Sequence, residues 1–483
     1  MAMEGFTRTF RPLEIITDEQ LEAIHRGTLD VLEQTGIRFE SKKALALFEK
    51  NGCRVDHDEM RVRFPPGLVE ECLRSCPSSF RVKARDERYD VIIGGNTVYF
   101  RTFPGMHTVD LTTWESRAAT RKENYDAVTV LDALDNLHIL GLYTPYFGFE
   151  GVAPVMGMPE SFAAKMRNSA KVQCTGYSQD CEVFTIQMAQ AVGTEMIGFL
   201  GASPPLTFHS ETVQAAFRFV EAGFPVFVVS GACYGATAPA TLAGATVSSN
   251  AEIIAGLVLI QLIKPTTRVY VSDTGFPQNM RTGSPSFGDI GISLHTVMFN
   301  QLWRKYGVPR NNSGVGPSNS KEIDFQCGYE KAMGILISAL SGANIICTHG
   351  GIHGEITYHP IQSILDDDIA GMVGRFLAGA TVNPEMLAID LINEVGPIPG
   401  HYLDKAHTRT WWKKEQYIPK AADRLTYPEW MKAGKKSALT YARERMEGIL
   451  ANHEPIPLSP SQEQDIERIL AEARNYYKDK GQL

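Results

Sequence analysis

Aromatic, hydroxyl and histidine side chains recur at the ends of short apolar segments, and these residue types define the chemistry open to the chain. Carboxylates are scarce among them, so the pair of acids that a glycosidase needs is not evident. A group of ring faces can instead hold a quaternary ammonium ion, which is attracted to ring faces without donating hydrogen bonds. The alternative is that the rings only pack, since aromatic side chains supply much of the buried area in most folds. The segment-end residues are Tyr99, Phe100, Arg101, Tyr143, Tyr146, Gln173, Thr175, Tyr177, Phe208, His209, Ser230, Cys233, Tyr234, Ser272, Asp273, Ser313, Thr348, His349, His353 and Tyr358.

His349 and His353 stand four residues apart, the spacing that places two metal ligands on one face of a helix. Gly350 and Gly351 lie between them and make a helix unfavourable there. We therefore favour a polar glycine loop that positions a substrate group, with a structural histidine as the alternative for His353. A metal site formed by distant residues stays open, although zinc ligands usually come in closer pairs. Its candidate ligands are Cys174, Cys233, Cys327, Cys347 and His349.

Asp366, Asp367 and Asp368 form the one run of three adjacent carboxylates that resembles a magnesium anchor. Such a run more often begins a helix, where carboxylates accept from free N–H groups and meet the positive end of the helix dipole. We favour the helix start.

The elements that must position these side chains alternate between strand-like and helical segments from residue 95 to residue 379. The count of eight strands predicts a parallel sheet closed into a (β/α)₈ barrel, an α/β fold with its reactive groups at the carboxyl ends of the strands. An open doubly wound sheet is the alternative, but no glycine-rich dinucleotide turn follows the first strand. The predicted strands are 96–101, 138–143, 172–177, 206–209, 226–230, 269–272, 310–313 and 345–349, and the helices include 121–135, 211–222, 239–263, 289–306, 322–341 and 364–378.

Two further regions flank the predicted barrel. Residues 1–94 form a mixed N-terminal cap, in which Asp18 caps a helix that ends at Gly36 and further helices follow near 42–51 and 67–76. Residues 380–483 are helical and charged, with a polar helix at 461–480, and we expect this C-terminal extension to pack on the barrel.

Size and composition are those of a soluble globular protein. The chain has 483 residues, of which 43% are hydrophobic and 21% charged, so it can bury a full core. Its net charge of −8 gives no overall attraction to nucleic acid or to an anionic membrane. The apolar run 253–263 is short for a bilayer span, and the N-terminus has no secretory pattern. Eight cysteines without a CxxC pair indicate free thiols, so we expect a cytoplasmic protein.

Several ordered blocks resemble the trimethylamine methyltransferase family, including its members without pyrrolysine. They include SGACYGATAPATLAGATVSSNAEIIAGLVLIQL (230–262), MRTGSPSFG (280–288), DDDIAGMVGRFLAG (366–379) and EVGPIPGHYLDKAHT (394–408), and the similarity covers nearly the whole chain. The resemblance implies a (β/α)₈ enzyme that moves a methyl group from a methylated amine to the cob(I)alamin of a separate corrinoid protein. Trimethylamine enzymes of the family carry pyrrolysine, which this sequence lacks. The resemblance therefore points to the branch that demethylates quaternary amines such as glycine betaine, proline betaine or carnitine.

Strand-end position and the resemblance together imply a set of substrate-binding residues. Tyr99 and His349, from strands one and eight, are expected to anchor a substrate carboxylate, and no residue is catalytic beyond positioning. Phe208, Tyr177, Tyr234 and Tyr358 are expected to form an aromatic wall, with His353 nearby.

The same resemblance implies the cofactor and the partners. No metal and no tightly bound cofactor are expected, because cob(I)alamin, or methylcobalamin after transfer, is supplied by the cognate corrinoid protein. A homo-oligomer is expected, with no nucleic acid or membrane partner. The alternatives are a zinc-dependent corrinoid methyltransferase with another methyl donor, and a non-catalytic betaine-binding protein.

Overall fold

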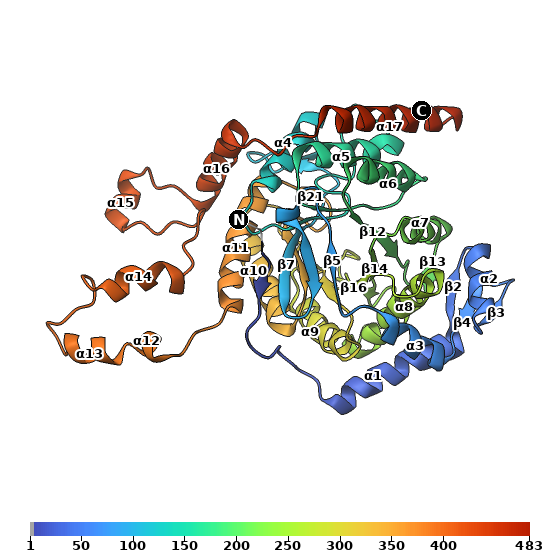
Figure 1. Cartoon of the computed structure of the whole chain (residues 1–483), viewed down its shortest axis with the longest axis horizontal. Helices are drawn as coiled ribbons and strands as arrows, with labels where there is room; N and C mark the ends of the chain where they lie inside the picture. The colour runs from blue at the N-terminus through green and yellow to red at the C-terminus, as the bar shows by residue number, and fades with distance from the viewer. Residues whose placement is uncertain (1–3) are drawn as a thin grey trace.

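The computed structural model describes residues 4–483 and contains a closed barrel of parallel strands surrounded by helices (Figure 1). Pairing of the last strand with the first closes the ring, which confirms the predicted (β/α)₈ fold. The strand β14 reads VFVVS and is buried throughout, as expected for a parallel strand covered on both faces. The barrel strands are β7 (Thr97–Thr102), β10 (Ile139–Leu140), β11 (Val172–Cys174), β12 (Met196–Gly201), β14 (Val226–Ser230), β16 (Val269–Asp273), β18 (Arg310–Asn312) and β19 (Ile345–His349).

The fourth barrel strand is β12, so the prediction of 206–209 at this place is wrong. The sequence of β12 is MIGFLG, whose two glycines weaken its strand signal. Gly198 is needed because the ring of Phe219 packs against it, and a Cβ atom there would lie 2.3 Å from that ring. Residues 206–209 contain a real strand, β13 (Thr207–Phe208), but it joins a small outer sheet with β2 (Ile37–Phe39), β4 (Arg61–Arg63) and β3 (Arg54–Asp56).

Helices cover the outside of the barrel. The predicted helices correspond to α4 (Arg121–Asp132), α7 (Ser210–Glu221), α8 (Leu242–Ile263), α9 (Ile290–Lys305), α10 (Phe325–Ser341) and α11 (Pro360–Leu377), whereas α5 (Pro154–Asn168) and α6 (Cys181–Val192) are not predicted. Helix α8 has the length and hydropathy of a membrane span, yet 78% of its apolar window is buried within the protein. It is therefore a core helix, packed against β14 and the N-terminal helices.

The N-terminal region is integrated with the barrel. Thr17, rather than Asp18, caps the first helix, because the Thr17 side chain accepts from the amide of Gln20 and the Gln20 side chain accepts in return from the Thr17 amide. The first helix ends in a π-helical turn (Val31–Thr35) before Gly36. The helices are α1 (Asp18–Asp30), α2 (Lys42–Lys50) and α3 (Pro66–Ser75), and β1 (Phe6–Thr7) pairs antiparallel with β7.

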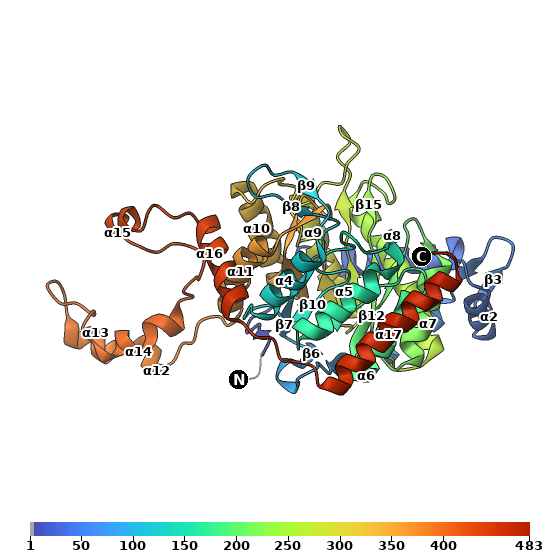
Figure 2. The ribbon, with the colours of Figure 1, turned by 90° about the horizontal axis from the view of Figure 1, so that it is seen from above.

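A hairpin closes the amino-terminal end of the barrel. Its strands β5 (Ser79–Val82) and β6 (Val91–Gly94) place Phe80 and Ile93 against the inward side chains of the barrel strands, including Phe227. The amino-terminal end is thus filled by side chains. Access to the barrel interior is from the opposite end, where the loops carrying β8 (Thr108–Val109), β9 (Ser116–Arg117) and β15 (Cys233–Tyr234) rise above the strands (Figure 2).

The C-terminal region has two parts, one that packs on the barrel and one that projects from it. Helix α16 (Ala438–Asn452) packs on α11 and α4, and α17 (Pro460–Asp479) packs on α5 and α6. Helices α12 (Pro384–Leu387), α13 (Ile389–Val395), α14 (Ala406–Glu415) and α15 (Tyr427–Lys432) instead project sideways from the barrel (Figures 1 and 2). Helices α12, α13, α14 and α15 therefore depart from the expectation that the whole extension packs on the barrel, whereas Ala421, between α14 and α15, is buried beside α11.

Candidate active site

A cavity of about 210 Å³ lies at the carboxyl ends of the barrel strands and is walled mainly by aromatic rings. Its one basic group is the guanidinium of Arg101, on β7. The position agrees with the general place of active sites in such barrels. The lining residues are Arg101, Phe103, Pro104, Leu142, Tyr143, Phe147, Phe199, Phe227, Val229, Thr274, Ser313 and Glu355.

Arg101 is a buried cation whose side-chain partners are a cysteine sulfur and two hydroxyl groups. Its Nε donates to Cys347 Sγ at 2.7 Å, its Nη2 donates to Ser313 Oγ at 3.2 Å, and its Nη1 lies 3.4 Å from the Tyr270 hydroxyl. Burial opposes its charge, but electrostatic interaction with Cys347 and Tyr270 raises the pKa above the ordinary arginine value, so the group stays protonated. Within residues 4–483 no carboxylate forms an ion pair with it. A buried charge without a counter-ion is costly, so the site favours an anionic ligand.

The aromatic wall stands beside this cation. Tyr143 stacks on Phe147 with ring centroids 4.8 Å apart, and the Arg101 guanidinium lies 4.7 Å from the ring centre of Phe227. Phe199 stacks on Tyr177 at 5.6 Å. The Tyr143 hydroxyl donates to the Tyr177 carbonyl at 3.1 Å, and burial raises the Tyr143 pKa, so this hydroxyl is neutral. The pocket thus has a cationic pole and a wall of electron-rich ring faces.

Glu355 separates this cavity from a larger outer one of about 630 Å³. Glu355 is an exposed residue, yet the surroundings of its carboxyl group desolvate it and raise its pKa above the ordinary value. The outer cavity is lined by Met106, Phe276 and Phe287 together with Lys321 and polar loop residues. The inner pocket is thus adjoined by an outer cavity whose surface is partly apolar.

Two predicted site residues lie near the mouth of the barrel, the end at which the strands have their carboxyl ends. Tyr177 stands behind Phe199 and supports it without lining the inner cavity. His353 lines the outer cavity, where burial and the charge of Lys321 lower its pKa.

Tyr99 and Phe208 lie outside the mouth, which contradicts the roles predicted for them. Tyr99 faces the barrel interior from the amino end of β7, where its hydroxyl accepts from the Ile92 amide of the closing hairpin at 3.0 Å. Phe208 belongs to the outer sheet and stacks on Phe39 with ring centroids 4.8 Å apart.

Tyr234 and Tyr358 are packed in the core and do not form the predicted aromatic wall. Tyr234 is buried with its ring centroid 4.9 Å from that of His295, and Tyr358 is fully buried against Tyr146 with its hydroxyl 3.0 Å from Ser363. Neither lines the inner cavity.

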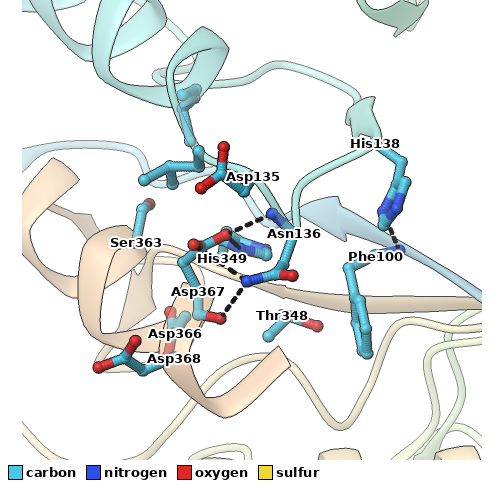
Figure 3. A network of polar contacts seen from close by, with 12 residues as sticks. Phe100, Asp135, Asn136, His138, Thr348, His349, Ser363, Asp366, Asp367 and Asp368 are labelled. Atoms are coloured by element: carbon cyan, nitrogen blue, oxygen red, sulfur yellow. Dashed lines mark hydrogen bonds and ion pairs between the residues drawn. The ribbon is translucent and has the colours of Figure 1, made fainter. Parts of the chain in front are cut away.

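His349 does not line the pocket, which contradicts its predicted role as a substrate anchor. Its ring lies instead beside Asn136 and Asp367 (Figure 3). Its Nε2 lies 3.4 Å from Oδ1 of Asp367 on α11, and the Asn136 amide donates to the same carboxylate at 2.9 Å. Burial alone would raise the Asp367 pKa, but the contact with His349 lowers it below the ordinary value. The register of β19 against β7 shifts between Cys347 and His349, and this irregularity accounts for Cys347 pointing inward and His349 outward.

The aspartate run lies within α11 rather than at its start, so the predicted helix-start role is wrong. Each carboxylate is buried and has its own partner. Asp366 pairs with Lys331 at 3.1 Å, Asp367 with His349, and Asp368 accepts from the Ala421 amide at 2.6 Å. The three side chains point to different parts of the fold and do not converge on an ion.

Of the residues considered for a metal site, Cys174 and Cys347 lie near each other around Arg101 and Tyr270, and the other three lie elsewhere. Cys233 contacts Gln278 at 2.7 Å, Cys327 contacts Gln362 at 3.5 Å, and His349 contacts Asp367. In the part of the chain that the structure describes, residues 4–483, no three histidine, cysteine or acidic side chains are grouped to hold a metal ion. These five residues therefore do not form the convergent metal site considered from the sequence.

The residues predicted from the sequence include few of those that form the aromatic wall. Phe199 lies on the strand that was not recognised, and Phe227 lies inside β14 rather than at its end. Arg101 and Tyr143 stand among the predicted strand-end residues, but nothing in the sequence marked Arg101 as lacking a counter-ion.

The sequence is similar to those of known methyltransferases. The sequence model described as trimethylamine methyltransferase (MTTB) matches residues 1–476. A glycine betaine methyltransferase of Desulfitobacterium hafniense (strain Y51) is 32% identical, over 95% of this chain and 96% of that protein. Trimethylamine methyltransferase MttB of D. hafniense (strain DSM 10664 / DCB-2) is 28% identical, over 95% and 94%. The solved monomethylamine methyltransferase (MtmB) of Methanosarcina barkeri aligns over 94% of this chain and 92% of its own, with a TM-score of 0.49 and 10% identity. The chain belongs to the trimethylamine methyltransferase family.

Proposed function

We propose that this protein transfers a methyl group from a betaine, a quaternary amine that carries a carboxylate, to cob(I)alamin held by a separate corrinoid protein. Methyltransferase activity is the property of the family. The observation that carries the finer proposal is the Arg101 guanidinium, a buried cation without a carboxylate partner in residues 4–483, next to an aromatic wall.

The two poles of the pocket match the two poles of a betaine. A carboxylate would pair with the open side of the Arg101 fork, and such charge-assisted hydrogen bonds are among the strong ones in proteins. The trimethylammonium group would then meet the rings of Tyr143, Phe147 and Phe199, each of which attracts a cation by about 0.5–2 kcal/mol. Trimethylamine has no carboxylate and would leave Arg101 without a counter-ion.

The chemistry asks the protein mainly for positioning. When bound in its own carrier protein, cob(I)alamin supplies the nucleophile that receives the methyl group. The amine leaves as a neutral tertiary amine, so the pocket needs no general acid, and Tyr143 with its raised pKa offers a neutral wall rather than a proton. Arg101 fixes one end of the substrate and thereby the direction of the other, which is the orientation effect that lowers the barrier of a two-body transfer.

The loss of the substrate's positive charge during the reaction limits how tightly the aromatic rings should bind the ammonium group. The ammonium charge disappears as the C–N bond breaks, so a very tight ring cage would stabilise the bound substrate more than the transition state. The pocket fits this requirement, because its rings line one wall and leave the side toward Glu355 and the outer cavity open. Met106, Phe276 and Phe287 of that outer cavity are the residues that would contact the corrinoid group of a docked partner.

A methyl-transfer assay with free cob(I)alamin tests the proposal. Glycine betaine, proline betaine, carnitine and trimethylamine are compared as donors, and formation of the methylated product is followed by its absorbance. We expect one of the betaines to react fastest. Faster transfer from trimethylamine than from every betaine would overturn the proposal, and tight betaine binding without any transfer would establish the non-catalytic binding protein instead.

A further inference from the structure

Glu355 lies between the two cavities at the mouth of the barrel and lines both of them. Within residues 4–483 its carboxylate takes part in no hydrogen bond or ion pair, and desolvation alone raises its pKa above the ordinary value. A carboxylate that loses contacts with water without gaining a partner costs free energy. The protein thus maintains an unpaired acid beside the pocket, although the proposed methyl transfer needs no acid.

The position of this carboxylate is fixed through its backbone. Glu355 lies in the turn 353–356 of a short antiparallel hairpin. On one side of the turn the Gly354 amide donates to the Ser318 carbonyl at 2.7 Å, and on the other the Glu355 carbonyl accepts from the Met106 amide at 2.9 Å. The turn is therefore held between two neighbouring loops, and Glu355 keeps its place at the boundary of the cavities.

None of the nearby basic side chains neutralises Glu355. The Lys321 ammonium, which lines the outer cavity, donates to the Asn319 carbonyl at 2.6 Å. Burial and the charge of Lys321 lower the His353 pKa, so this ring is uncharged at neutral pH. Arg101 lines the inner cavity together with Glu355, but its own contacts go to a thiol and two hydroxyl groups. The acid is left for a ligand.

The two charges of the inner cavity define a direction along it. Arg101 lines only the inner cavity, whereas Glu355 lines the inner and the outer one. A ligand that reaches both must carry its negative group at Arg101 and its positive group on the outer side, where a methyl acceptor arrives. Tyr143 and Phe199 line the same cavity, so the positive group would meet ring faces and the carboxylate together.

We propose that Glu355 is the residue that selects a cationic methyl donor, because its carboxylate is the counter-charge of the quaternary ammonium group and disfavours an uncharged group of the same shape. The inference rests on the proposed function, since it takes a betaine as the ligand. A quaternary ammonium donates no hydrogen bond, so its attraction to Glu355 is Coulombic and depends on proximity. The attraction is lost with the ammonium charge during the reaction, so Glu355 contributes to binding and selection rather than to the rate of the bound complex.

The test compares glycine betaine with the anion of tert-butylacetic acid. This anion has a carbon atom in place of the quaternary nitrogen, so it keeps the shape and the carboxylate without the positive charge. Dissociation constants of both ligands for the full chain are measured by isothermal titration calorimetry at neutral pH, and their ratio gives the preference for the cation. We expect the wild type to prefer glycine betaine.

Substitution of Glu355 should change this preference in a graded way. Glu355→Gln should reduce it at least about fivefold, the upper end of the effect of an exposed ion pair and the lower end for a desolvated one. Glu355→Lys should reduce it further and tighten binding of the uncharged analogue's carboxylate end. Glu322→Gln removes an exposed acid that lines neither cavity, so it is the matched control and should keep the wild-type preference.

Two outcomes would overturn the inference. The first is a wild type that binds both ligands equally well or binds neither. The second is a preference that Glu355→Gln reduces no more than Glu322→Gln does. Should Glu355→Gln melt at a lower temperature than the wild type, Glu355→Asp decides: it keeps the charge and must retain preference that the glutamine variant loses, and equal preference in the two variants would refute the role of the charge.

The inference and the proposed function can fail separately. A preference for the cation that depends on Glu355, without methyl transfer to cob(I)alamin, would overturn the proposed function alone. Methyl transfer from a betaine, without a preference that depends on Glu355, would overturn this inference alone.

Discussion

Replacing Arg101 by glutamine should separate the recognition of a carboxylate from the recognition of a quaternary ammonium. Three contacts of the guanidinium go to Cys347, Ser313 and Tyr270, and Arg101 also lines the inner cavity. A hydrogen bond to a charged group contributes about 1.5–3 kcal/mol, and 1.4 kcal/mol is a factor of ten. The dissociation constant for glycine betaine should therefore rise roughly 10- to 150-fold in the variant.

Isothermal titration calorimetry with two ligands makes the measurement specific. Choline keeps the trimethylammonium group but has a hydroxyl in place of the carboxylate, so its affinity should change less than about threefold, since its ring contacts persist. Arg101→Lys keeps the charge but loses the planar fork and should fall between the wild type and Arg101→Gln. Melting temperatures of all variants control for loss of the internal contacts. Unchanged betaine affinity, or an equal loss for betaine and choline, would refute the assignment of Arg101.

Two further predictions concern buried side chains, and a third concerns metal dependence. His349→Ala should lower the melting temperature and leave KM for the betaine nearly unchanged, because a buried Asp367 loses its partner at a cost of about 1–3 kcal/mol; a tenfold higher KM at unchanged melting temperature would restore His349 as a substrate anchor. Glu252 on α8 is fully buried and accepts a hydrogen bond from the Ser230 hydroxyl at 2.6 Å, and burial raises its pKa from 4.5 to about 7. The folded state therefore binds this proton more tightly, and stability falls as pH rises from 4.5 through 7, by at most about 3 kcal/mol. Glu252→Gln should flatten the melting temperature between pH 5.5 and 8, and an identical pH slope in both proteins would contradict this. Treatment with a metal chelator should leave methyl transfer intact, and stoichiometric zinc by elemental analysis together with loss of activity would reverse that expectation.

Strand position could be predicted from the sequence wherever apolar β-branched residues are continuous, as in β14 and β19. The fourth strand could not, because Gly198 and Gly201 remove the side chains that carry the signal. The predicted segment 206–209 does contain a strand, β13, but a local pattern does not specify the sheet to which a strand belongs. For this reason the sequence pattern assigns Phe208 to the barrel, whereas it belongs to the outer sheet.

The candidate site was predictable in kind but not in detail. An aromatic mouth was expected and is present, yet its rings are mostly not the expected ones. Tyr99 and Arg101 share the inward face of β7 and differ only in which end of the barrel they face, a distinction that depends on where the strand meets its neighbours. The direction of His349 depends on an irregularity in β19 that arises from pairing with β7 and leaves no local trace.

The aspartate run in α11 has a consequence for how the molecule unfolds. Successive residues of a helix point about 100° apart, so three adjacent buried carboxylates reach three separate regions. Asp366 connects to Lys331 on α10, Asp367 to β19 and the turn after α4, and Asp368 to the loop before α15. A shift or rotation of α11 would break the contacts of all three carboxylates at the same time. The closing strand of the barrel and the root of the C-terminal region should therefore open as a single cooperative unit, with matching free energies of opening in native-state hydrogen exchange.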